Sequence, residues 1–111
     1  MNSTSSTKDP LNGQMKKAFR GVAHHLDPVV SVSDRGLSDG IVAETERALN
    51  DHELIKVKIV GDREERGEVI KQIGKIDATE VIQIVGGVAL VYRRSRDPNP
   101  ALSNIYRANL L

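Results

Sequence analysis

The chain has 111 residues, 39% of them hydrophobic, which is enough for one domain with a single core. It contains no cysteine, so disulfides, thiolate zinc sites and cysteine nucleophiles are excluded. No apolar run reaches the roughly 18 residues that a membrane span requires, and the N-terminus lacks the apolar core of a secretion signal. We therefore expect a cytoplasmic protein with no membrane partner.

The formal net charge is only +1, but the charged residues are unevenly distributed. Residues 1–25 and residues 93–111 each carry four basic side chains and one acidic side chain. Residues 26–92 carry eight basic and thirteen acidic side chains. Such a distribution can create one basic face on a nearly neutral molecule, and that face matters more for recognition than the total charge.

The first expected elements are a leader and a helix. Residues 1–10 are rich in Ser and Thr and show no periodicity, so they predict a disordered leader. From residue 13 to 26 apolar residues recur at helical spacing, and Pro28 then disfavours the α conformation in the residue before it. Another face of this helix is basic, with the stripe Lys16, Arg20 and His24 and the neighbouring Lys17.

A strand, a turn and a second helix follow. Residues 29–33 form a short apolar strand, and the segment from Ser33 to Gly36 turns the chain. Ser38 is a good N-cap for a helix that runs to about Asp51. A glycine-containing turn at a helix start is a place where backbone N–H groups can meet phosphate.

The next strand carries alternating lysines. Between residues 54 and 60, Ile55, Val57 and Ile59 lie on one face, and Lys56 and Lys58 lie on the other. Because a face covered by helices would not tolerate two unpaired ammonium groups, we expect the lysine face to be open or at a sheet edge.

The remaining elements are a third helix and a hairpin. Asp62, with Glu65 three residues later, predicts a capping box at the helix start. Two strands, residues 79–85 and 88–93, flank Gly86-Gly87, a pair typical of a tight antiparallel turn. The order α-β-α-β-α-β-β predicts a single compact α/β (α+β) domain with a four-stranded mixed sheet. Residues 95–111 are expected to be a partly ordered tail.

Four motifs in this order resemble the YhbY-like proteins, also called the CRM domain family. They are RGVAHHL at 20–26 ahead of Pro28, RGL at 35–37 ahead of Gly40, HELIKVK at 52–58, and LVYR at 90–93. The resemblance covers about residues 11–94 and implies a fold similar to the C-terminal domain of bacterial translation initiation factor three. It also implies a non-catalytic RNA-binding protein, since bacterial stand-alone members associate with precursors of the large ribosomal subunit. The implied partner is therefore ribosomal RNA, and the implied role is in ribosome assembly.

The resemblance further implies a GxxG loop between the first strand and the second helix, similar to the phosphate-clamping loop of KH domains. Here Ser33 replaces the first glycine and Asp34 stands where the family often has a basic residue. An acid in the loop should repel phosphate, so we expect the flanking cations to carry more of the affinity. The expected RNA-binding residues are Lys16, Lys17, Arg20, His24, Ser33, Arg35, Gly36, Lys56, Lys58 and Arg93.

Other functions receive less support from the sequence. The adjacent His24 and His25 point about 100° apart on a helix, so they predict no shared metal ion. No P-loop, GxGxxG or nucleophile triad is present, so we expect no enzyme, cofactor or small-molecule substrate. Only Phe19, Tyr92 and Tyr106 are aromatic, which argues against a broad stacking platform. The alternative is a protein-interaction module that uses the acidic helix faces around 44–46 and 64–68. We expect a monomer.

Overall fold

The computed structural model describes residues 11–33 and 35–109, so the expectations about the leader and about Asp34 lie outside the described residues. The described elements, in chain order, are α1 (Gly13–Ala23), β1 (Pro28–Val32), α2 (Asp39–His52), β2 (Leu54–Ile59), α3 (Arg63–Gly74), β3 (Glu80–Val85), β4 (Val88–Tyr92) and α4 (Asn104–Arg107). The strands form one sheet in the order β1-β2-β4-β3. β1 runs parallel to β2, and the other two pairings are antiparallel. The predicted order of the first seven elements and the mixed sheet are confirmed, whereas α4 was not predicted.

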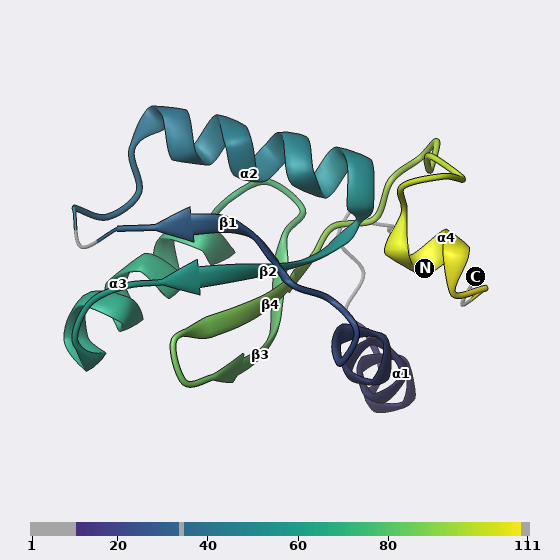
Figure 1. Ribbon diagram of the computed structural model, residues 1–111, viewed down its shortest axis with the longest axis horizontal. Helices are drawn as coiled ribbons and strands as arrows, with labels where there is room; N and C mark the ends of the chain where they lie inside the picture. Colours follow the sequence, from purple (N-terminus) through teal and green to yellow (C-terminus); the bar gives the residue numbers. More distant parts are fainter. Residues whose placement is uncertain (1–10, 34, 110–111) are drawn as a thin grey trace, which may run out of the picture.

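Helices cover both faces of the sheet. On one face, α2 and α3 pack Leu49 and Ile73 against the inner strands, including Val57. On the other face, α1 and α4 bury Phe19 and Ile105 against a smaller core. Figure 1 shows α1 and α4 gathered toward one end of the strands, with the connection from β1 to α2 at the opposite end. The second face is therefore covered over only part of its length.

Side chains cap the three longer helices at their starts. The Asn12 carboxamide oxygen accepts from the backbone N–H of Met15 at 2.8 Å, and the Ser38 hydroxyl accepts from that of Ile41 at 3.2 Å. The predicted capping box of α3 is present, because Asp62 and Glu65 each accept from the backbone N–H of the other at 2.8 Å. These caps satisfy N–H groups that have no partner within the helix.

α1 ends three residues earlier than the sequence predicts. It stops at Ala23, and the next three N–H groups, of His24, His25 and Leu26, donate to carbonyls three residues back. A tighter turn of this kind commonly ends a helix. It brings the chain into β1 directly at Pro28.

Candidate nucleic-acid interface

The lysine face of β2 is open in the middle of the sheet. Lys56 pairs with Pro28 and Leu90, and Lys58 pairs with Ser31 and Val88, so both lysines share the face on which α1 packs. Lys58 is exposed and Lys56 is half-buried. Since β2 is an inner strand, the two ammonium groups are tolerated because helices leave this part of the face uncovered.

The turn that follows β1 begins beside these lysines. Ser31 is the register partner of Lys58, and Ser33 follows two residues later. Within the turn, the Gly36 N–H donates to the Ser33 carbonyl at 2.9 Å, and the Arg35 N–H donates to the Ser33 hydroxyl at 3.3 Å. Both N–H groups are thus used inside the turn, and among its described residues Arg35 is an exposed cation and Ser33 an exposed hydroxyl.

Gly36 gives this turn its shape. Its φ of +84° lies in the left-handed region, which side chains with a Cβ adopt only at a cost. An added Cβ would meet nothing within 4 Å, so the requirement for glycine comes from the backbone and not from crowding.

The basic stripe of α1 lies at the other end of β1. Its apolar side buries Phe19, while Lys17 and His24 are exposed and Arg20 is half-buried. Lys16 is already partly neutralised, because its ammonium group lies 3.4 Å from the Glu80 carboxylate. With five residues in β1, the stripe and the turn are separated by roughly 16 Å of strand.

These groups together define what we call the basic track. It groups residues of α1, of the open sheet face and of the turn after β1, namely Lys16, Lys17, Arg20, His24, Lys56, Lys58, Ser31, Ser33, Arg35 and Gly36. Ser31 was not singled out from the sequence. Its alternation with Val30 and Val32 places it on the sheet face away from the α2/α3 core, but its position beside Lys58 depends on the strand register.

Arg93 does not lie on the basic track. Its guanidinium donates to the Glu46 carboxylate at 2.9 Å, to the Asn50 side chain at 2.9 Å and to the carbonyls of Glu46 and Asp77. These partners belong to α2 and to the segment after α3, on the face opposite α1. Only 12% of the side chain is exposed, so the structure shows Arg93 joining parts of the fold.

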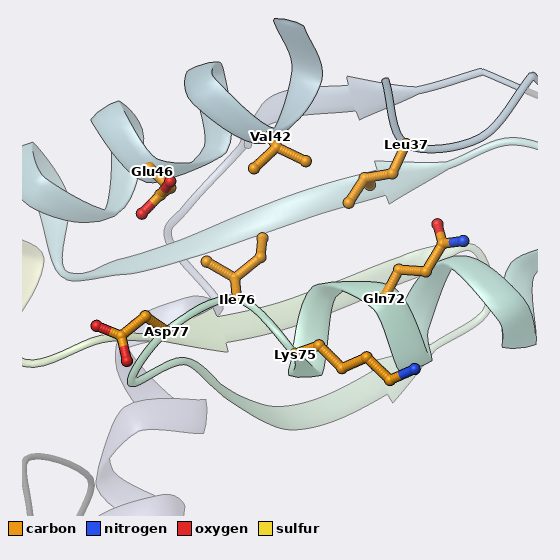
Figure 2. A pocket seen from close by; sticks show the side chains of 7 residues that line it. All are labelled: Leu37, Val42, Glu46, Gln72, Lys75, Ile76 and Asp77. Atoms are coloured by element: carbon orange, nitrogen blue, oxygen red, sulfur yellow. The ribbon is translucent and has the colours of Figure 1, made fainter. Parts of the chain in front are cut away.

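The opposite face contains a shallow cleft of about 400 Å³ between α2 and α3. Figure 2 shows Val42 and Ile76 pointing toward each other across it, with Glu46 and Asp77 near one end. A second cleft of about 280 Å³ lies between the β1–α2 turn and α3, and the acids that line it are Glu65 and Glu68. These carboxylates disfavour phosphate on the α3 side of the turn.

Neither a metal site nor a membrane span is found in the part of the chain that the structure describes. Across residues 11–33 and 35–109, no three His, Asp or Glu side chains gather as ligands for an ion. None of the described helices combines the length and the hydropathy needed to cross a bilayer.

Comparisons with known proteins identify the family. The model of the CRS1/YhbY (CRM) domain matches residues 11–93. A Pseudomonas aeruginosa protein named as a probable RNA-binding protein is 45% identical over 98 residues, which cover 87% of this chain and 94% of that one. A Haemophilus influenzae RNA-binding protein is 42% identical over 78% of this chain and 89% of its own length. The solution structure of a hypothetical Staphylococcus aureus protein matches 79% of this chain and 93% of that one, with a TM-score of 0.69 at 25% identity. The chain belongs to the CRS1/YhbY (CRM) domain family.

Proposed function

We propose that this protein binds RNA through the basic track. The observation that carries the proposal is the register of β1 and β2, which sets Ser31, two residues before the turn, beside Lys58 on the sheet face where α1 packs. Relatives that match most of this chain are named as RNA-binding proteins, which supports the same conclusion.

The track suits a phosphate backbone better than a base-reading surface. Its members are ammonium, guanidinium and hydroxyl groups, which bind phosphate and ribose oxygens. The rings of Phe19 and Tyr92 are buried against each other, with centroids 4.8 Å apart, and are not available to bases. The track therefore favours recognition by backbone and shape.

We further infer that the RNA is ribosomal and belongs to precursors of the large subunit. This step rests on the resemblance to bacterial stand-alone members of the family, and it makes the protein a non-catalytic participant in ribosome assembly. Sedimentation of the tagged protein with ribosomal particles, followed by crosslink mapping on the RNA, tests it. Crosslinks confined to small-subunit RNA, or absent from both subunits, would contradict it.

The track itself is tested by the salt dependence of RNA binding. Each phosphate neutralised contributes roughly 0.7 to 0.9 to the slope of log affinity against log salt. Replacing both Lys56 and Lys58 with Gln should therefore reduce the slope by about 1.4 to 1.8. The matched control replaces Lys71 and Lys75 of the α2/α3 side with Gln, and should leave the slope unchanged. Equal effects of the two double variants would show that net charge, not the track, controls binding.

A second candidate function is protein docking on the α2/α3 side. The cleft that Val42 and Ile76 line favours a segment with apolar side chains. Its charged lining is mixed, because Asp77 is accompanied by Lys75, and Glu46 is already paired with Arg93. Ribonuclease treatment separates the two functions. Association with ribosomal particles through RNA is lost after digestion, whereas a direct protein contact survives it.

A further inference from the structure

The segment after β4 is held in place by a buried carboxylate. Glu53, between α2 and β2, is 0% exposed. One of its oxygens accepts from the Ser103 hydroxyl at 2.7 Å and the other accepts from the Ser95 N–H at 2.8 Å. The segment is thereby attached at two points eight residues apart, and a buried carboxylate satisfied in this way is costly to disrupt.

Further contacts fix the short helix α4. The Asn104 carboxamide donates to the Leu54 carbonyl at 2.7 Å, and Ile105 is 0% exposed in the core shared with α1. The Ser103 hydroxyl also accepts from the Tyr106 N–H at 3.1 Å. The backbone at residue 106 is therefore positioned by the residues just before it, which contact the domain.

This anchoring presents an aromatic ring to solvent. The chain has three aromatic residues, and the other two are buried, whereas Tyr106 is 52% exposed. The exposed cations of the same segment are Arg94, Arg96 and Arg107. α4 packs on the same sheet face as α1, and Figure 1 shows the two helices at the same end of the strands. The helix that carries the ring thus lies on the same sheet face as α1.

We propose that residues 94–107 form a second RNA-binding element, in which Tyr106 stacks on an unpaired base and the neighbouring arginines contact its flanking phosphates. This inference rests on the proposed RNA-binding function and deepens it, because it names single-stranded or looped RNA as the preferred ligand. The element lies beyond the family match, which ends at residue 93. The fixed backbone reduces the entropy lost when the ring stacks.

The stacking contact is tested with two RNAs that share a stem, one a hairpin with an unpaired loop and one a fully paired duplex. Removing one base–aromatic stack typically weakens binding roughly five- to a hundredfold. We expect Tyr106→Leu to weaken binding of the hairpin by this factor and to leave binding of the duplex unchanged. Tyr106→Phe keeps an aromatic ring and should bind the hairpin as tightly as the wild-type protein. Leu102→Ala, which truncates another exposed apolar side chain of the segment, is the matched control and should change neither affinity.

A direct readout is available because the chain has no tryptophan. In Tyr106→Trp the new indole is the sole one, and its fluorescence should be quenched by the hairpin and not by the duplex. Hairpin binding that is unchanged in Tyr106→Leu overturns the stacking inference while leaving the basic track intact. Failure of the wild-type protein to bind either RNA overturns the proposed function, and this inference with it.

Discussion

Ser103 donates its hydroxyl hydrogen to the Glu53 carboxylate across 2.7 Å, although the two residues are 50 positions apart and neither is exposed. Glu53 also has a left-handed backbone, with φ of +62°, at the junction of α2 and β2. A non-glycine residue in this conformation is uncommon and costs free energy. Hydrogen bonds from Ser95 and Ser103 to the Glu53 carboxylate, which attach the C-terminal segment to the start of β2, offset that cost.

Ser103→Ala should therefore destabilise the protein by more than the loss of a helix cap. The variant leaves a buried carboxylate oxygen without its donor, which costs about 1–3 kcal/mol, and removes the cap of α4, which costs about 0.5–2 kcal/mol more. Ser38→Ala removes only the cap of α2 and is the control. Denaturant unfolding measures both. Equal losses in the two variants would contradict a special role for the Glu53 contact.

The turn after β1 should depend on the left-handed conformation of Gly36. Gly36→Ala forces a Cβ into φ of +84° and should cost about 1–2 kcal/mol of unfolding free energy. Gly67 in α3 has open space around an added Cβ, so Gly67→Ala should instead stabilise the protein by up to about 1 kcal/mol. Thermal unfolding measures the change in unfolding free energy of each variant. A loss in Gly36→Ala together with a gain in Gly67→Ala supports the turn geometry, whereas a stabilised Gly36→Ala would contradict it.

Arg93 should contribute to stability through the shape of its guanidinium. Arg93→Lys keeps the charge but cannot reproduce the donors to Glu46, Asn50 and the Asp77 carbonyl, so roughly 2–3 kcal/mol should be lost. Arg47→Lys, on the exposed side of α2, is the control and should be neutral. Chemical unfolding gives both values. Wild-type stability in Arg93→Lys would show that the network contributes little.

Much of the fold was predictable because its signals are local. The alternation of Lys56 and Lys58 with apolar neighbours predicted a strand whose lysine face is open or at a sheet edge, and the structure shows it open on an inner strand. Asp62 with Glu65 predicted the start of α3. The side chain of Ser38 likewise caps α2 as expected. In each case the periodicity or the capping residue lies within a few positions of the structure that it specifies.

The roles of Glu53, Arg93 and α4 could not be predicted in the same way. Nothing near Glu53 in the sequence shows that it will be enclosed by Ser95 and Ser103, because that contact joins residues more than 40 positions apart. Arg93 follows Tyr92 at the end of a strand, a position that is equally typical of a surface cation. Its partners Glu46 and Asn50 lie more than 40 residues earlier in the chain, so the sequence does not reveal them. α4 has four residues, too few for a periodic signal.

Tyr92 should make stability fall at high pH. Burial, followed by the negative charges of Glu53 and Glu80, raises the pKa of Tyr92 from 10.0 to about 12, against the opposing effect of Arg94. Between these values the unfolded chain loses the phenol proton and the folded protein keeps it, so the unfolded state is favoured as pH rises. Unfolding free energy should decline by on the order of 2 kcal/mol from pH 10 to about 12. Tyr92→Phe has no phenol group at this position and should not show this decline in unfolding free energy. An identical decline in that variant would assign the loss to other groups.

Glu80 should limit RNA binding by holding Lys16. The two side chains form an ion pair at 3.4 Å on the α1 side of the sheet, with 36% of the Lys16 side chain and 19% of the Glu80 side chain exposed. Glu80→Gln releases the ammonium group and removes a negative charge beside the basic track. We expect RNA affinity to rise by roughly two- to fivefold at low salt, in line with an exposed pair worth up to about 1 kcal/mol, and the gain to fade as salt increases. Glu44→Gln, an exposed acid of α2 on the far face, is the control for net charge. An equal gain in RNA affinity in both variants would show that the total charge causes the effect. A gain confined to Glu80→Gln would indicate that Lys16 contacts the RNA.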